Sequence, residues 1–313
     1  MRTQPRVLSL LPAATEIVCD IGGRSQLVGR SHACDYPDGL DAVPVVCRPR
    51  VDVNASSGEI DRAVNEASLA AVSLFEVLPG AIEAAKPDVI LTQSLCSRCA
   101  VDAEAVEAAV ADLAGQPVEV LSMSPTSLDD VAETFRQVGE AIGCYSKELL
   151  RDFHAKLEAL GRRTGTAGPQ RVLCLDWTDP PMQAALWVPE LVALVGGSGR
   201  LELDATGQSR SLEVDTRRLA ELKPDVIVSA PCGFELPRAI AETEAMLARP
   251  EWQSLLNDCR IRVFAADGSN FFNRPGPRLV ETAEVIAAAI DPRPASSLVP
   301  MIESMARHGS PST

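Results

Sequence analysis

Short runs of Val, Ile and Leu alternate along the chain with longer segments in which apolar residues recur every three or four positions. The clearest short runs lie at 6–10, 86–92, 171–175 and 223–229. Such runs are typical of buried parallel strands, and the intervening segments have the spacing of helices that cross from one strand to the next. The pattern therefore predicts an α/β fold built on parallel sheets.

The chain carries this plan twice. The sequence RVLSL at Arg6–Leu10 returns as RVLCL at Arg171–Leu175. The sequence KPDVI occurs in both halves, at 86–90 and again at 223–227. In each half the first strand is followed by a helical segment that ends in a double glycine, which is a common way to end a helix. The repeat predicts two Rossmann-like lobes.

A long helical pattern lies between the repeats. Leu128, Val131, Phe135 and Val138 follow helical spacing, and the pattern continues to Gly161. It predicts one rigid helix of about 35 residues, or two nearly collinear helices, that would connect the lobes. The predicted organisation is an N-terminal α/β lobe at 1–123, a connecting helix at 124–167, a C-terminal α/β lobe at 168–292 and a weakly ordered tail at 293–313.

Charge and hydropathy narrow the range of partners. The formal net charge is −14 over 313 residues, which disfavours nucleic acid and anionic membrane surfaces. No apolar run reaches the roughly 18 residues that a membrane-spanning helix needs. Near the N-terminus the apolar run VLSLL is short and meets Pro12, which fits a strand and a helix start better than a secretory signal. We therefore expect a cytoplasmic protein, or a periplasmic or other extracytoplasmic one if a leader has been removed.

Candidate ligand-binding residues follow directly after the predicted strands. In parallel α/β sheets, ligands bind beyond the carboxyl ends of the strands. Aromatic residues make up only 4% of the chain, yet several fall at these positions, and such a surface suits a large, flat ligand. The predicted ligand-binding residues are Pro12, His32, Tyr36, Trp177, Phe234, Asn270, Phe271, Phe272 and Arg274.

Packing is the alternative interpretation for several of these residues. Trp177, Phe271 and Phe272 would then be buried side chains inside a lobe, since aromatic side chains are usually buried. His32 would be a loop histidine that is hydrogen-bonded to a carbonyl group.

Four of the nine cysteines also fall after predicted strands: Cys34, Cys96, Cys99 and Cys232. Cys96 and Cys99 form a Cys-x-x-Cys pair, and the repeat places Cys232 after the equivalent strand of the second lobe. Thiolates in such an arrangement suit Zn²⁺ or an iron–sulfur cluster, with His32 as a further ligand. The pair alone would also suit thiol redox chemistry at a helix N-terminus. A cytoplasmic metalloprotein with these four cysteines as ligands therefore remains an alternative to a binding protein.

The stretches SLLPAATE, LVGRSHACDYP, KPDVILTQ and NFFNRPGPRLV resemble the class III substrate-binding proteins of ABC importers. The closest type is the periplasmic vitamin B12-binding protein, and the resemblance covers about residues 5–292. It implies two lobes bridged by a long rigid helix, with a corrinoid, haem, siderophore or metal ion held in the cleft between them. It also implies that 33–36, Trp177 and 270–274 lie where a corrinoid would be held.

The resemblance therefore implies a binding protein for a small-molecule ligand, namely cobalamin or a related metal chelate, that acts as an intracellular carrier or with an importer. The glutamates through which the B12-binding type docks onto its importer would fall at Gly80 and Arg217, which disfavours docking; Glu83 and Glu221 are the alternatives for this role. The sequence contains no Ser–His–Asp set and no paired carboxylates at a readable spacing, so we do not expect an enzyme.

Overall fold

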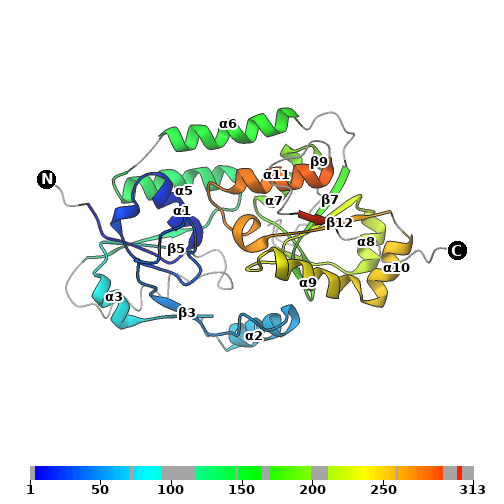
Figure 1. Cartoon of the computed structure of the whole chain (residues 1–313), viewed down its shortest axis with the longest axis horizontal. Coiled ribbons are helices and arrows are strands. Elements are labelled where there is room, and N and C mark those ends of the chain that lie inside the picture. Colours follow the sequence, from blue (N-terminus) through cyan, green and yellow to red (C-terminus); the bar gives the residue numbers. More distant parts are fainter. Residues whose placement is uncertain are drawn as a thin grey trace. The chain divides into compact units, whose positions relative to one another are not determined.

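A computed structural model describes residues 4–70, 74–93, 117–144, 147–163, 170–198, 211–258, 260–291 and 302–304. The chain forms two compact units, each with its own sheet (Figure 1). Unit 1 comprises Met1–His154 and Pro275–Pro277, and unit 2 comprises Ala155–Arg274 and Arg278–Thr313. Both units have the α/β character that the alternating pattern predicts.

Unit 1 contains a four-stranded sheet in the order β2-β1-β5-β6, and all of its pairings are parallel. A separate antiparallel pair, β3 with β4, accompanies it. The described elements of unit 1 are β1 (Val7–Ser9), α1 (Pro12–Asp20), η1 (Arg24–Gln26), β2 (Leu27–Arg30), β3 (Cys47–Pro49), α2 (Ser57–Leu69), β4 (Phe75–Val77), α3 (Pro79–Ala85), β5 (Val89–Gln93), β6 (Glu119–Met123) and α5 (Leu128–Ala141). The helix α6 (Lys147–Arg163) begins in unit 1 and continues into unit 2.

The predicted connecting segment consists of two helices, α5 and α6. The rings of Phe135 in α5 and Phe153 in α6 meet edge to face with centroids 5.1 Å apart. These residues are 18 positions apart, so in a continuous helix or in two collinear helices they would be separated by about 27 Å. The prediction of one long helix or of two collinear helices is therefore wrong. The chain turns after Ile142, where Gly143 adopts a positive φ of 70°, and α6 lies alongside α5 (Figure 1).

Unit 2 is built on a mixed sheet, whereas the sequence predicted a parallel one. The central strands β7, β11 and β12 are parallel, but β8, β10 and β13 pair antiparallel in the order β10-β8-β7-β11-β12-β13. The described elements of unit 2 after α6 are β7 (Gln170–Thr178), β8 (Pro181–Gln183), α7 (Val188–Leu194), β9 (Gly197–Ser198), β10 (Leu212–Glu213), α8 (Thr216–Leu222), β11 (Val226–Ser229), α9 (Leu236–Leu247), α10 (Pro250–Asp258), β12 (Arg262–Ala266), the π-helix η2 (Gly268–Phe272), α11 (Leu279–Ile290) and β13 (Ile302–Ser304). Within the predicted tail, Ile302–Ser304 thus pairs with β12, and the rest of the tail lies outside the described residues.

The repeated KPD sequence forms the same turn in both units. Lys86 ends α3 and Lys223 ends α8, each in the left-handed conformation with φ of 45° and 47°. A proline follows each lysine and disfavours continued helix. Asp88 then accepts a hydrogen bond from the backbone nitrogen of Arg6 at 2.7 Å. The equivalent bond in unit 2 joins Asp225 to the nitrogen of Arg171 at 2.8 Å, so the internal repeat extends to individual atoms.

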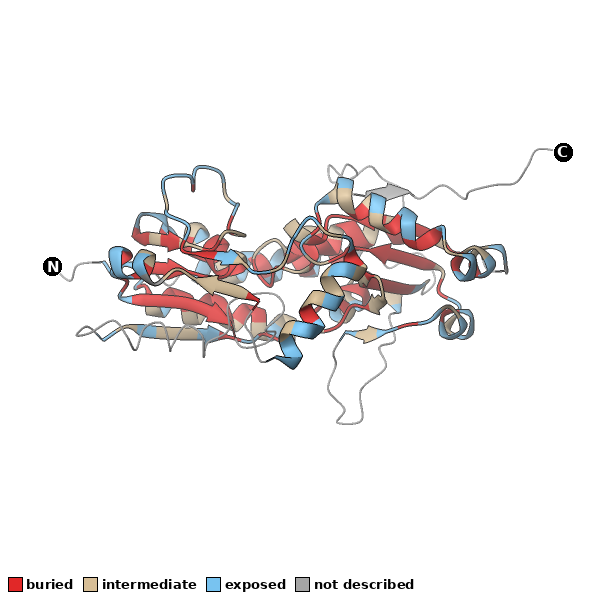
Figure 2. Cartoon of the chain, turned by 90° about the horizontal axis from the view of Figure 1, so that it is seen from below, coloured by how far each residue is buried: buried red, intermediate tan, exposed pale blue. Residues whose placement is uncertain are grey.

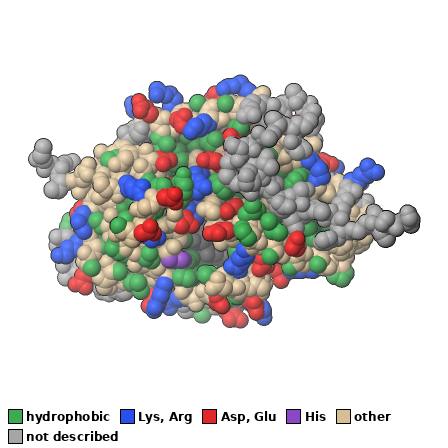
Figure 3. All heavy atoms as spheres, viewed as in Figure 1, with side chains coloured by type: hydrophobic (Ala, Val, Ile, Leu, Met, Phe, Trp, Pro, Cys, Tyr) green, Lys and Arg blue, Asp and Glu red, His purple; other side chains and the backbone are tan. Residues whose placement is uncertain are grey.

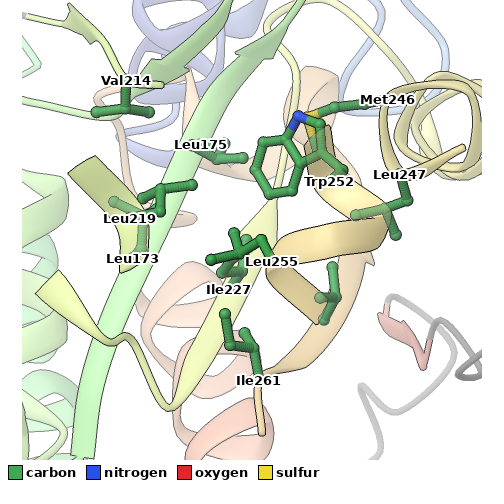
Figure 4. Close-up of a cluster of buried hydrophobic side chains, with 11 residues drawn as sticks. Leu173, Leu175, Val214, Leu219, Ile227, Met246, Leu247, Trp252, Leu255 and Ile261 are labelled. Carbon is green, nitrogen blue, oxygen red and sulfur yellow. The ribbon is translucent and has the colours of Figure 1, made fainter. Parts of the chain in front are cut away.

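Buried residues concentrate in the strands of each sheet and on the helix faces that cover them (Figure 2). In unit 2 the indole of Trp252 from α10 lies among side chains from β7, α9 and α10 (Figure 4). Burial of such an aromatic side chain stabilises the fold by about 2–3 kcal/mol through the apolar area removed from water. This cluster consists of Leu173, Leu175, Val214, Leu219, Ile227, Met246, Leu247, Trp252, Leu255, Ile261 and Val263.

Charged side chains of both signs are mixed on the one face of the molecule that Figure 3 draws. On the face drawn in Figure 3, Asp and Glu side chains are interspersed with Lys, Arg and hydrophobic side chains. Among the described residues, no helix has both the length and the apolar character that crossing a membrane requires.

Candidate functional site

The carboxyl end of β2 leads into a loop that contains three of the predicted ligand-binding or metal-binding residues. Arg30, the last residue of β2, holds this loop through three backbone carbonyl groups. Its Nε donates to Leu40 and Val43 at 3.2 and 3.1 Å, and its Nη1 donates to Cys34 at 2.7 Å. The charged guanidinium therefore fixes the loop between residues 31 and 44 from inside.

His32 lies half-buried at the start of this loop. Its Nδ1 is 3.4 Å from Sγ of Cys47, and its ring lies 5.5 Å from the ring of Phe75. Burial lowers the pKa of His32, because an apolar surrounding disfavours the charged imidazolium. The imidazole is therefore neutral at pH 7, which is the form that ligates metal ions.

Cys34 is a fully buried thiol, with 0% of its surface exposed. The Oγ1 atom of Thr15 donates to its sulfur at 3.0 Å, and the thiol in turn lies 3.8 Å from the backbone oxygen of Ser9. These contacts attach the loop to β1 and α1, so Cys34 packs as a small core residue. Tyr36, two residues later, is 41% exposed, and Pro12 lies partly exposed at the start of α1.

The metal-binding hypothesis remains a prediction at the Cys-x-x-Cys pair, because Cys96 and Cys99 lie outside the described residues. Cys232 is partly buried just after β11, in unit 2. In the described part of the chain, no three or more His, Cys, Asp or Glu residues come together in a way that could hold a metal ion.

In unit 2, the carboxyl ends of β7 and β11 bring two aromatic rings together. Trp177 is half-buried near the end of β7, and its indole nitrogen donates to the backbone oxygen of Asp179 at 3.1 Å. Its ring lies 5.2 Å from the ring of Phe234, which follows β11 and is 3% exposed. The guanidinium carbon of Arg238, in the first turn of α9, lies 3.6 Å from the centroid of the Phe234 ring.

The residue before Trp177 carries an unusual carboxyl group. Burial raises the pKa of Asp176 to about 7, although a hydrogen bond from the hydroxyl of Ser211 favours the ionised form. The backbone oxygen of Asp176 accepts from the nitrogen of Cys232 at 2.9 Å. A titratable group therefore lies near the end of β7, beside the loop that follows β11.

The loop after β12 folds into the π-helix η2, which carries the remaining predicted residues of unit 2. Asp267 caps it by accepting from the backbone and side-chain nitrogens of Asn270 at 2.7 and 2.9 Å. Phe271 and Phe272 are buried, and the indole nitrogen of Trp187 donates to the backbone oxygen of Phe272 at 3.1 Å. Single π-turns of this kind are frequent at functional sites.

Arg274 is also buried, and its Nε donates to the backbone oxygen of Ser269 at 2.6 Å. Within unit 2 the four rings predicted to line a binding surface thus differ in exposure: Phe234, Phe271 and Phe272 are buried, and Trp177 is half-buried. Arg238 did not emerge from the sequence. It lies four residues after Phe234, in the first turn of the helix α9 that follows.

No family model and no curated protein matches the chain. Several solved structures, in contrast, are similar to the structure of this chain. A periplasmic haem-binding protein from Pseudomonas aeruginosa has a TM-score of 0.69 at 18% identity, over 98% of this chain and 100% of that one. A protein from Staphylococcus epidermidis, described as a possible iron-binding periplasmic solute-binding protein, has a TM-score of 0.66 at 20% identity, over 93% and 100%.

The periplasmic vitamin B12-binding protein of Vibrio cholerae has a TM-score of 0.60 at 20% identity, over 92% of this chain and 96% of that one. The chain has the fold of the class III solute-binding proteins. The sequence resemblance predicted this fold, and the match extends over nearly the whole length of each neighbour.

Proposed function

We propose that the protein is a binding protein for a metal chelate, and that the chelate is a flat macrocycle such as a corrinoid or haem. The observation that carries this proposal is the aromatic pair of Trp177 and Phe234 at the carboxyl end of the unit 2 sheet. In an α/β fold this is where ligands bind. A half-buried indole backed by a second ring offers an apolar face for such a macrocycle.

The fold supports the same proposal. Its structural neighbours are described as binding haem, vitamin B12 or iron. The sequence resemblance favours a corrinoid, and the neighbours support the wider class of metal chelates that includes haem. Under this proposal Trp177 contacts the ligand, and the buried rings of Phe234, Phe271 and Phe272 hold the surrounding loops in place.

The neighbours also bear on location and partners. All three are described as periplasmic, which supports an extracytoplasmic protein rather than the cytoplasmic carrier. Gly80 lies exposed on α3 and Arg217 lies exposed on α8, so neither position offers the carboxylate through which the B12-binding type would dock. We therefore propose ligand binding without glutamate-mediated docking at these two positions.

A visible-absorption titration tests the proposal. Cobalamin, cobinamide and haem would each be added to the purified full chain, with lysozyme at equal concentration as a control for non-specific uptake. We expect a saturable change of the absorption bands at one equivalent with at least one of the three chelates. Linear, non-saturating responses to all three chelates, equal to those of lysozyme, would contradict the proposal.

A further inference from the structure

A histidine and a cysteine meet beside the antiparallel pair of strands in unit 1. The Nδ1 atom of His32 lies 3.4 Å from Sγ of Cys47, which begins β3. The pairing of β3 with β4 places Cys47 opposite Val77 and Pro49 opposite Phe75. Because side chains alternate between the two faces of a strand, Cys47 and Phe75 lie on one face. The His32 ring also lies on this face, with its centroid 5.5 Å from that of Phe75.

The surroundings of this pair are apolar. Cys47 is 1% exposed and belongs to the hydrophobic core cluster of unit 1. The charged residues of the two strands, Arg48 and Glu76, project from the opposite face and pair with each other at 2.8 Å. Among the described residues, the side chains of His32 and Cys47 make no polar contact except the one with each other. A sulfur and a ring nitrogen therefore face each other with their lone pairs committed to no other group.

Two ligands are too few for most protein-bound metal ions. Zinc sites use three or four protein ligands, whereas no third His, Cys, Asp or Glu joins this pair in the part of the chain that the structure describes. Cu⁺ is a soft ion with a filled d shell that accepts two ligands in a line, and thiolate and imidazole suit it. Bonds of the length found with zinc, about 2.3 Å to sulfur and 2.0 Å to nitrogen, would place the two atoms about 4.3 Å apart across such an ion. The gap between them therefore has to widen by about 1 Å.

The charge balance favours a monovalent ion. On binding, the S–H bond of Cys47 breaks, its proton passes to water, and the sulfur and Nδ1 of His32 each donate an electron pair to the ion. One thiolate, one neutral imidazole and one monovalent cation have no net charge together. A divalent cation would leave a positive charge in the apolar surroundings, where an unpaired charge is costly. His32 is half-buried, so an ion reaches the buried sulfur from the side of the imidazole.

We propose that His32 and Cys47 bind one Cu⁺ ion between Nδ1 and Sγ. The site shares no residue with the chelate-binding surface proposed in unit 2, and the inference does not depend on whether a chelate binds there. It also differs from the metal-binding hypothesis drawn from the sequence. Cys47 was not among those four cysteines, because it lies within a strand rather than after one.

Anaerobic titration with Cu⁺ in competition with the chromogenic chelator bicinchoninate tests the proposal. The chelator removes ions that a single thiol holds weakly. The parent protein is the full chain with Cys96→Ser and Cys99→Ser, so that the Cys-x-x-Cys pair does not contribute. We expect Cys47→Ser in this parent to bind one equivalent of Cu⁺ fewer, and His32→Gln to weaken the same equivalent at least about tenfold.

Cys19→Ser is the matched control, because it removes a partly buried thiol on α1 that no histidine contacts among the described residues. It should bind Cu⁺ as the parent does. If the melting curve shows that Cys47→Ser does not fold, His32→Gln carries the test, since its side chain is half-buried. Equal Cu⁺ stoichiometry in the parent and Cys47→Ser, or equal affinity in the parent and His32→Gln, overturns the inference. Chelate binding to unit 2 is measured separately, and neither result bears on it.

Discussion

Gly268 lies so close to Ala230 that a Cβ atom added to the glycine would be 2.4 Å from the carbonyl oxygen of Ala230. The same atom would be 2.1 Å from the oxygen of Pro231. Side-chain bonds reinforce the contact, since the amide of Asn273 donates to the backbone oxygens of Ala230 and Gly268 at 3.3 and 2.9 Å. The loops after β11 and β12 therefore form one interlocked unit beneath the proposed binding surface.

This contact predicts that Gly268→Ala is strongly destabilising. Both oxygens belong to the backbone, so the loops themselves would have to move apart to admit a methyl group. We expect a loss of about 2–4 kcal/mol in the free energy of unfolding, measured by urea denaturation. Gly80→Ala is the matched control, because a Cβ there meets nothing within 4 Å and should change stability by less than about 1 kcal/mol. Equal effects of the two substitutions would show that the loops are not interlocked.

The raised pKa of Asp176 predicts that the stability of the protein depends on pH. Burial raises the pKa of Asp176 in the folded protein to about 7, against about 3.9 in the unfolded chain. Between these values the folded protein binds more protons than the unfolded chain, so the free energy of unfolding falls as the pH rises from about 4 to about 7. Asp176→Asn has no such proton to lose.

We therefore expect Asp176→Asn to be more stable than the wild-type chain at pH 8, by about 1–3 kcal/mol, and the two to converge near pH 4. Denaturant unfolding at pH 4, 6 and 8 measures the difference. A constant difference between the two proteins across this range would mean that Asp176 does not titrate as stated.

A substitution of Cys34 distinguishes a thiol that packs in the core from a thiol that binds a metal ion. Because its thiol is buried against Thr15 and Ser9, Cys34→Ala should lower the free energy of unfolding by about 1–3 kcal/mol, through lost packing and a lost hydrogen bond. Zinc and iron content, measured after purification without oxygen and without added metals, should be the same in the variant as in the wild-type chain. Loss of bound metal on Cys34→Ala would instead identify Cys34 as a ligand.

The sequence predicted the parts of the fold that depend on local pattern. The repeated strands and KPD turns lie where the repeat placed them, because short apolar runs and a proline after a helix have few structural solutions. The turn between α5 and α6 was missed, because the helical pattern of apolar residues continues on both sides of Gly143 and says nothing about the direction of the second helix. The antiparallel strands β8, β10 and β13 were missed as well, since two or three residues are too few to show a strand pattern.

The candidate site was less predictable. Position near the end of a strand brought Trp177 and Phe234 together, since Trp177 lies near the end of β7 and Phe234 follows the neighbouring parallel strand β11. The position of a residue after a strand could not show which aromatic rings are buried, because burial depends on the helices and loops that cover the rings. It also could not distinguish a core thiol from a metal ligand at Cys34, because both interpretations place a cysteine after a strand.

The central claim is that a metal chelate binds against Trp177. Calorimetric titration of the wild-type chain and Trp177→Ala, with whichever of cobalamin, cobinamide and haem gives saturable binding, tests it most directly. Removing the ring should weaken binding about ten- to hundredfold, because contact with a flat ligand buries apolar area worth about 1.5–3 kcal/mol. Trp252→Phe is the control, since its indole is buried in the hydrophobic core of unit 2, and it should bind as the wild-type chain does. Unchanged affinity in Trp177→Ala, or no binding heat from the wild-type chain with any of the three chelates, would contradict the account.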